Sequence, residues 1–353
     1  MKIAYILNHD ISKNDGVTKK VFEQVTEWEK LGHKVEIFAI TSKRGNNLLS
    51  LHVYDKNALF RIAFNKNLWR DINNYNPDII YMRYDLLSRT ILKLLGKYKF
   101  VVEINTDDIN ESLLLFKTYK SLKTFLRYII NYISRDIIFR NVYGIITVTE
   151  ELSKMYIKYA KPTICVPNGI NLEKYNIIKT VREDDKIGLF FIGSPNQPWQ
   201  GVDIVEKIAK RLPDYYFHIV GPEGKNTKNL FYYGFLQRED YLRILNKSHI
   251  CIGTLALYRK RMKEACPLKV REYLAYGYPV IIGYDDIAFL NQAIPDYILK
   301  IDPMNIELEI ERIKNFILKN KNRVVTHEEI YSKISTKVLE EKRISFLERI
   351  AFK

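Results

Sequence analysis

The chain repeats one pattern along its length: a short apolar run, a polar loop and an amphipathic helical stretch. The first copy has an apolar run at Ile3 to Leu7, a helical stretch at Val21 to Leu31 and a second apolar run at Lys34 to Ile40. Strands that alternate with helices form parallel sheets, because each crossover places a helix against a face of the sheet. The pattern therefore predicts an α/β protein with parallel sheets.

Further apolar runs of strand length fall into two sets. One set lies at 78–82, 100–104, 144–148 and 164–166, and the other at 187–192, 216–220, 230–233, 250–253 and 279–282. At 353 residues the chain is longer than a typical single core, so two domains are expected. The polar stretch at 171–186 between the two sets is the best candidate for a linker.

The charge of the chain favours anionic partners. It carries 56 Lys and Arg against 41 Asp and Glu, a net charge of +15. No nucleic-acid motif and no long basic run is present, so nucleotide phosphates and an anionic lipid surface explain the charge better than nucleic acid does.

The three cysteines and the N-terminus indicate a cytoplasmic protein. Cys165, Cys251 and Cys266 lie in or beside apolar runs without the spacing of metal ligands, and they read as reduced thiols. The chain enters a strand pattern at once, so neither a signal peptide nor a transmembrane helix is expected.

One stretch carries the clearest chemistry: KEACPLKVREYLAYGYPVIIG, Lys263 to Gly283. A helix that begins near Pro267 or Leu268 would present unpaired backbone N–H groups and its positive dipole end to an anion. Lys269 would stand in the first turn, Glu272 in the second, and Glu264 on the loop before the helix. The stretch thus offers positive charge for phosphate and two carboxylates for sugar hydroxyls, as a nucleotide-sugar site needs.

This stretch resembles the E-x7-E and G-x-P-V signature of family 4 glycosyltransferases, which are retaining enzymes with a GT-B fold. The strings VPNGI at 166–170 and GSPNQPWQG at 193–201 resemble further motifs of that family. The resemblance implies two Rossmann-like domains with parallel sheets facing across a cleft. We then expect an acceptor domain over 1–168, a nucleotide-sugar donor domain over 169–325, and a C-terminal helix over 326–353 that packs back on the first domain.

The resemblance also implies roles for individual residues. Glu264 and Asn105 would act on the transferred sugar as catalytic residues, and Glu272 would bind the ribose. The other donor-side candidates are Lys269, Leu268, Pro267, Gly193, Gln200, Gly201, Phe235, Leu236 and Gly16. Arg83 and Asp107 follow strands of the first domain and are expected on the acceptor side.

Three positions depart from the family pattern. The family places an Arg and a Lys in the loop at 193–201, where this chain has Ser194 and Gln200, and often a His where Asn105 stands. Asn can bond a hydroxyl but cannot carry a proton. Lys269 would therefore neutralise the diphosphate in place of a metal, with Arg259, Lys260 and Arg261 as further candidates.

The expected function is transfer of a sugar from a nucleotide-sugar, with UDP favoured, to a glycan or lipid-linked acceptor in surface polysaccharide synthesis, with no metal or other cofactor. A non-catalytic GT-B partner of an active transferase and a nucleotide-sugar epimerase stay open as alternatives. The basic, aromatic helical pattern at 119–140 is either an interfacial helix on the inner face of the cell membrane or a core-packed helix with a solvated basic face.

Overall fold

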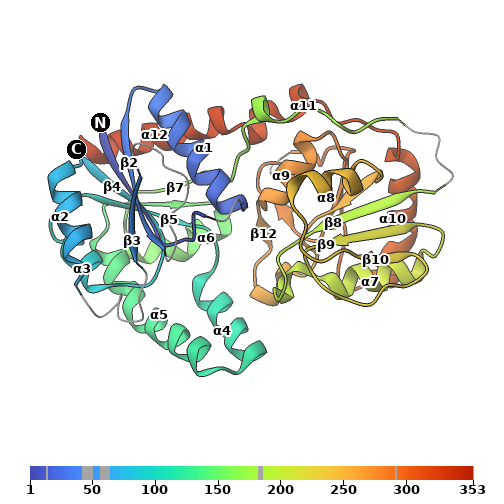
Figure 1. Ribbon diagram of the computed structural model, residues 1–353, viewed down its shortest axis with the longest axis horizontal. Coiled ribbons are helices and arrows are strands. Elements are labelled where there is room, and N and C mark those ends of the chain that lie inside the picture. The colour runs from blue at the N-terminus through green and yellow to red at the C-terminus, as the bar shows by residue number, and fades with distance from the viewer. Residues whose placement is uncertain (13–14, 42–50, 56–63, 182–185, 291, 353) are drawn as a thin grey trace. The chain divides into compact units, whose positions relative to one another are not determined.

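The computed structural model describes residues 1–12, 15–41, 51–55, 64–181, 186–290 and 292–352 (Figure 1). The chain forms two compact units. Unit 1 comprises Met1–Pro167 and Thr336–Lys353, and unit 2 comprises Asn168–Ser335. The backbone passes from one unit to the other at two points, so unit 1 is built from both ends of the chain.

Unit 1 is built on a parallel sheet whose described strands run in the order β3-β2-β1-β4-β5-β6-β7. The strands are buried apolar runs, as expected where helices cover both faces. Their bounds are β1 (Lys2–Leu7), β2 (Lys34–Thr41), β3 (Leu51–Asp55), β4 (Ile79–Arg83), β5 (Phe100–Ile104), β6 (Gly144–Thr147) and β7 (Thr163–Cys165). The strand order reverses between β1 and β4, where a doubly wound sheet places its ligand site.

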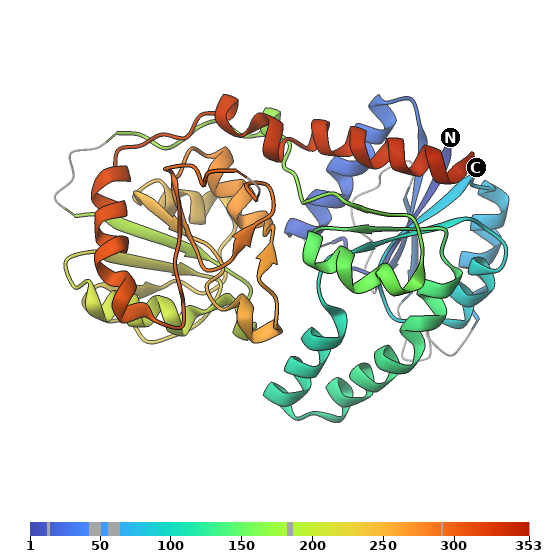
Figure 2. The ribbon, with the colours of Figure 1, turned by 180° about the vertical axis from the view of Figure 1, so that it is seen from behind.

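The helices of unit 1 are α1 (Gly16–Lys30), α2 (Lys66–Tyr75), α3 (Arg89–Leu95), α4 (Asp108–Tyr119), α5 (Leu122–Asn141), α6 (Glu150–Tyr156), the 3-10 turn η1 (Ile157–Tyr159) and α12 (Thr336–Ala351). Trp28 of α1 and Phe346 of α12 enter one core with the strands, so these two helices cover the same face of the sheet. The helices α4 and α5 form a hairpin that extends away from the sheet (Figures 1 and 2).

Unit 2 repeats the doubly wound arrangement, with described strands in the parallel order β10-β9-β8-β11-β13-β15. Their bounds are β8 (Gly188–Ile192), β9 (Tyr216–Val220), β10 (Leu230–Tyr232), β11 (Ile250–Ile252), β13 (Val280–Ile282) and β15 (Ile298–Lys300). The short strands β12 (Glu264–Ala265) and β14 (Asp285–Asp286) pair separately. Here the order reverses between β8 and β11.

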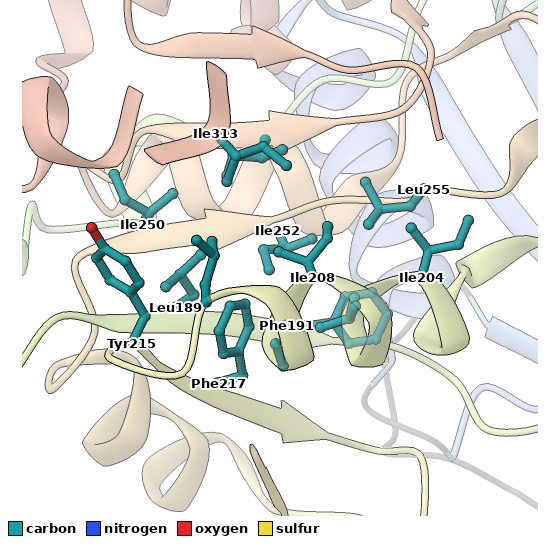
Figure 3. Close-up of a cluster of buried hydrophobic side chains, with 14 of the residues drawn as sticks. Leu189, Phe191, Ile204, Ile208, Tyr215, Phe217, Ile250, Ile252, Leu255 and Ile313 are labelled. Atoms are coloured by element: carbon teal, nitrogen blue, oxygen red, sulfur yellow. The ribbon is translucent and has the colours of Figure 1, made fainter. Parts of the chain in front are cut away.

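The helices of unit 2 are α7 (Val202–Arg211), α8 (Arg238–Leu245), α9 (Leu268–Ala275), α10 (Ile306–Asn320) and α11 (His327–Ile334), with 3-10 turns η2 (Leu172–Lys174), η3 (Pro198–Gln200) and η4 (Leu257–Lys260). Figure 3 shows Ile204 and Ile208 of α7 and Ile313 of α10 packed with strand residues such as Phe191 and Phe217. This apolar core fixes the strand ends that carry the loops described below.

The structure confirms the predicted parallel α/β architecture and several predicted elements. The helix α7 spans Val202–Arg211 as predicted, α9 begins at Leu268, and β13 lies in the predicted apolar run. The strand β3 and the helix α2 were not predicted, since β3 has no continuous apolar run and the apolar positions of α2 are few.

Two long helical patterns are each divided in the structure. The pattern at 119–140 breaks at Lys120, whose backbone is left-handed (φ 46°), and α5 starts anew after the cap Ser121. The pattern at 326–350 breaks at Ser335, where the backbone is extended. The helix α11 belongs to unit 2, where the His327 Nε2 lies 2.9 Å from the Ala275 carbonyl oxygen.

These breaks change the expected division of the chain. The segment that returns to unit 1 begins at Thr336 and not at residue 326, and the first passage between units lies at Pro167–Asn168. The described part of the expected linker at 171–186 lies within unit 2, where the Ile178 N–H donates to the Tyr276 carbonyl. The prediction that residues 171–186 form the linker between the two domains is therefore wrong.

Candidate functional site

The candidate site of unit 2 lies beyond the carboxyl ends of its central strands. Ligands of doubly wound proteins bind where the strand order reverses, here between β8 and β11. The loop Gly193–Gly201 follows β8, and the turn η4 and the strand β12 follow β11. The backbone joins them, since the Leu255 and Ala256 N–H groups donate to the Gln200 and Trp199 carbonyls at 3.1 Å.

Three glycines bring the loops after β8, β9 and β10 together. The Gly193 N–H donates to the Val220 carbonyl at 3.0 Å, and the Gly221 N–H donates to the Gly234 carbonyl at 2.7 Å. Gly221 has a φ of +97°, and a Cβ there would lie 1.9 Å from the Gly193 carbonyl oxygen. A side chain at 221 is therefore excluded, a requirement that the sequence analysis missed.

Lys269 stands in the first turn of α9, beside that loop. Its Nζ donates to the Gln200 Oε1 at 2.6 Å and lies 3.9 Å from the centre of the Phe191 ring. Burial lowers the pKa of Lys269 well below its usual value. Within the described part of the chain no carboxylate pairs with Lys269, and no side chain caps the N-terminus of α9. The start of α9 thus combines a desolvated lysine with uncapped backbone N–H groups, and both favour the binding of an anion.

The other basic candidates have partners or face solvent. Arg259 donates to both carboxylate oxygens of Asp203, at 3.0 and 2.7 Å, and to the Pro198 carbonyl at 2.7 Å. The Lys260 Nζ lies 4.7 Å from the centre of the Trp199 ring, and Arg261 is exposed.

The two glutamates of the signature occupy different settings. Glu272 lies in the second turn of α9, and its Oε1 accepts from the Tyr241 hydroxyl at 2.7 Å. Burial and the nearby Glu272 raise the pKa of Tyr241 above its usual value, so the phenol stays a donor. Glu264 lies on β12, half-buried, and β12 is aligned by the Asp285 N–H, which donates to the Lys263 carbonyl at 2.8 Å.

A buried ion pair that the sequence analysis missed anchors α9. The Arg271 guanidinium donates to both oxygens of Asp286, at 2.8 and 2.6 Å, and to the Asn168 carbonyl at 3.0 Å. The Asn168 side chain donates to the Cys266 carbonyl at 3.0 Å and so braces the residue before Pro267. The VPNG string therefore positions the start of the helix. The one signal for Arg271 was a charge on an otherwise apolar helix face.

The remaining unit 2 candidates lie on the turn after β10. Gly234 has a φ of +62° and holds the turn through its carbonyl. Phe235 is 79% exposed and Leu236 is half-buried. The turn thus offers an exposed ring and backbone groups at the same edge of the sheet as Gly193.

In unit 1 the candidate Asn105 lies just past the end of β5, where a buried lysine holds it. The Lys20 Nζ donates to the Asn105 Oδ1 at 3.1 Å and also to Glu103. Burial lowers the pKa of Lys20 to about 8, against the opposing effect of Glu103. The Asn105 Nδ2 is buried and has no hydrogen-bond partner among the described residues, so it can donate to a ligand.

Glu103 is the centre of a buried ionic network. It is fully buried, accepts from the Lys20 amine and the Tyr81 hydroxyl, and lies 3.8 Å from Arg83 and 3.9 Å from Arg343. Burial would raise the pKa of Glu103, but these cations hold it well below its usual value. The sequence analysis missed this network, although a glutamate inside an apolar strand was a visible signal.

Asp107 and Gly16 stand at helix starts in unit 1. The Asp107 side chain caps α4 by accepting from the Asn110 N–H at 3.0 Å. Gly16 is the first residue of α1, and the Asp15 side chain caps that helix. These contacts explain both residues structurally. Among the described residues, no group of three or more His, Cys, Asp or Glu side chains could hold a metal ion.

Comparisons with known proteins bear on the identity of the chain. A search of curated proteins finds no match. Residues 14–174 match the family model described as Glycosyltransferase Family 4. The N-terminal part of the chain, over these residues, thus belongs to glycosyltransferase family 4. The match confirms the recognition of a glycosyltransferase of family 4, and it lies outside the signature at Lys263 to Gly283.

Solved structures show that the transferase has the GT-B fold. One is sucrose-phosphate synthase from Thermosynechococcus elongatus, with 14% identity, a TM-score of 0.69, and 99% of this chain and 98% of that chain covered. The lipopolysaccharide outer core galactosyltransferase WaaB matches with 12% identity, a TM-score of 0.65 and 99% of both chains. HepE from Anabaena, in complex with UDP and glucose, matches with 11% identity, a TM-score of 0.63, and 99% of this chain and all of that chain.

Proposed function

We propose that this glycosyltransferase moves a sugar from a UDP-sugar to a glycan or lipid-linked acceptor, with retention of the anomeric configuration and without a metal. The observation that carries the proposal is Lys269, a desolvated cation with only neutral partners at the open start of α9. A diphosphate placed there would supply the missing negative charge.

The donor is held by unit 2 in this proposal. The Lys269 amine and the first N–H groups of α9 neutralise the leaving diphosphate, and the backbone of Gly193, Gln200 and Gly201 borders it. Glu272, oriented by Tyr241, accepts hydrogen bonds from the ribose hydroxyls. Phe235 and Leu236 border the base. Pro267 and Leu268, at the start of α9, complete the proposed donor site.

Glu264 stabilises the positive charge that develops on the transferred sugar as its bond to the diphosphate breaks. The acceptor oxygen then bonds to the face of the anomeric carbon that the diphosphate leaves, and the acceptor hydroxyl passes its proton to the departing diphosphate oxygen. In unit 1, the unpartnered Nδ2 of Asn105 donates to a sugar hydroxyl. Arg83, Asp107 and Gly16 border the acceptor in the proposal.

The acceptor class and the location are supported by resemblance and charge. The fold is shared with a lipopolysaccharide galactosyltransferase, and the chain has a net charge of +15. We therefore place the reaction in surface polysaccharide or glycoconjugate synthesis, with the transferase in the cytoplasm and peripheral to the inner face of the membrane. None of the described helices is long and apolar enough to cross a bilayer.

Calorimetric titration with UDP, GDP, ADP, CMP and dTDP, without added metal, tests the donor assignment. UDP is expected to bind, and Glu272→Ala to weaken its binding about 10- to 150-fold, as loss of a charged hydrogen-bond partner does. Glu264→Ala should leave UDP binding nearly intact and lower turnover about 100- to 1,000-fold. The donor assignment fails if no nucleotide binds, and the division of roles fails if both variants lose binding equally.

A further inference from the structure

The helix α5 exposes its apolar face. Leu122 is 72% exposed, Leu126 47% and Ile133 68%, with Ile130 and Ile137 also exposed. These five residues, here called the apolar stripe, are spaced by 3 or 4 positions along the chain and so share one side of the helix. A helix on a soluble protein normally turns such a stripe inward. This arrangement excludes the core-packed alternative for this face.

The inward face of α5, which buries Asn131, Ile138 and Phe139, is firmly held by a polar network. The Asn131 Oδ1 accepts from the Tyr84 hydroxyl at 2.6 Å, and its Nδ2 donates to Asp108 at 2.8 Å. Arg135 donates to the same carboxylate at 3.1 Å. Asn131 is buried, and rotation of the helix would break this network. The outward position of the apolar stripe is therefore fixed by contacts inside unit 1.

The hairpin presents the apolar stripe away from the sheet of unit 1. The Phe116 and Phe125 rings, 5.2 Å apart, join α4 to α5 near their connection. Both views show this hairpin extending from its unit (Figures 1 and 2). A contiguous exposed apolar area of this kind marks a surface for a partner or a membrane.

Positive charge accompanies the apolar stripe. The hairpin also exposes basic side chains, namely Lys117, Lys120, Lys123, Arg127 and Arg140. The acidic side chain of α5, Asp136, accepts from the Tyr159 hydroxyl. A second copy of this chain docked on the stripe would bring like charges together, which is unfavourable. An anionic lipid surface would instead match both the apolar stripe and the cations beside it.

We propose that α5 lies on an anionic lipid surface, with the apolar stripe below the headgroups and Lys123 and Arg127 beside the lipid phosphates. The inference deepens the proposed function and rests on it for its purpose, because it names the surface on which a lipid-linked acceptor would be met. Binding to lipid does not require catalysis, so the two can fail separately.

Flotation of the full chain with lipid vesicles tests the proposal. The chain is expected to bind vesicles of phosphatidylcholine with phosphatidylglycerol, and to bind phosphatidylcholine alone more weakly. High salt should weaken the binding, because it screens the lipid charge. The paired change Leu122→Gln and Ile133→Gln should weaken binding about tenfold or more, since it removes apolar area from the interface.

Matched variants separate this surface from general effects. Met304→Gln with Leu308→Gln changes two similarly exposed apolar residues of unit 2 and should leave vesicle binding unchanged. Lys123→Gln with Arg127→Gln should weaken binding to anionic vesicles and barely alter binding to neutral ones. All variants should bind UDP as the parent does, which shows that they are folded.

Three results would overturn the proposal. The first is that the parent chain floats with neither type of vesicle. The second is that the variant in Leu122 and Ile133 binds vesicles as well as the parent chain does. Alternatively, light scattering would show a dimer that this variant dissociates, which would assign the apolar stripe to a second copy. Loss of UDP binding in the parent chain would overturn the proposed donor site and leave the lipid surface standing.

Discussion

The two units share the order of their first six strands but surround a lysine near the strand ends in opposite ways: Lys20 is buried and Lys269 is half-buried. Beneath the strand ends of unit 1, Lys20 is compensated by Glu103, and Arg343 pairs with Glu340. At the strand ends of unit 2, Lys269 meets an amide and an aromatic ring. Lys20 is paired with a carboxylate of its own unit, whereas the printed partners of Lys269 are neutral.

This difference teaches that a buried lysine is not by itself a functional signal. A buried charge is costly, and its partner decides whether the protein or a ligand supplies the compensation. In unit 1 the network also holds α12, because Glu340 accepts from the Trp28 indole N–H at 2.8 Å. In unit 2 the corresponding structural role falls to Arg271 and Asp286, which leaves Lys269 uncompensated.

The largest expected effect comes from Lys20→Met. Loss of the amine removes the nearest cation from the buried Glu103, and leaves the Tyr81 hydroxyl and the more distant Arg83 and Arg343 nitrogens, at 3.8 and 3.9 Å. Breaking a buried pair typically costs about 3–5 kcal/mol. The free energy of unfolding, measured by urea titration, should fall by about that amount. Lys19→Met is the neighbouring control and should stay within about 0.5 kcal/mol of the parent. Equal stability of the two variants would contradict the comparison.

The same substitution in unit 2 should have the opposite profile. Lys269→Met removes an uncompensated cation, so stability should be unchanged or higher by about 1 kcal/mol. UDP binding, measured by calorimetry, should weaken about 10- to 150-fold. If Lys269→Met instead unfolds the chain and Lys20→Met does not, then the roles assigned to the two lysines are reversed.

The smallest expected effect is a loss of stability in acid that is larger in unit 2 than in unit 1. Burial, and then the nearby Lys247, lower the pKa of His218 on β9 from 6.5 to about 4. Between pH 6.5 and 4 the unfolded state binds more protons, so unit 2 loses stability as the pH falls through this window. We expect the free energy of unfolding of unit 2 to fall by about 1–2 kcal/mol across this window, after allowance for solvent screening.

Hydrogen exchange measured at pH 6.5 and pH 4.5 checks this last prediction. Protection of β8 and β9 should fall relative to β1 and β4, after correction for the intrinsic rate of exchange. His218→Asn should flatten the pH dependence in unit 2. Parallel loss in both units, unaffected by this variant, would assign the acid sensitivity elsewhere.

The sequence by itself determined the architecture and the position of the principal motif. Apolar runs that alternate with helical patterns predicted the parallel sheets, because side-chain periodicity is a local property. Pro267 and Gly277 bounded α9 closely, since Pro suits a helix start and Gly, at a φ of +92°, suits the end. The family signature could be recognised for the same reason, because it is defined by the spacing of residues along the chain.

Only the tertiary structure decided which charges are compensated and which apolar face is covered. Lys20 and Glu103 are 83 residues apart, and nothing local to either residue indicates the other. The stripe on α5 has the same periodicity whether it faces a core or solvent. Its outward position follows from Asp108, which binds the polar side of α5 from another helix. Pairing and burial depend on which elements meet, and that is a property of the folded chain.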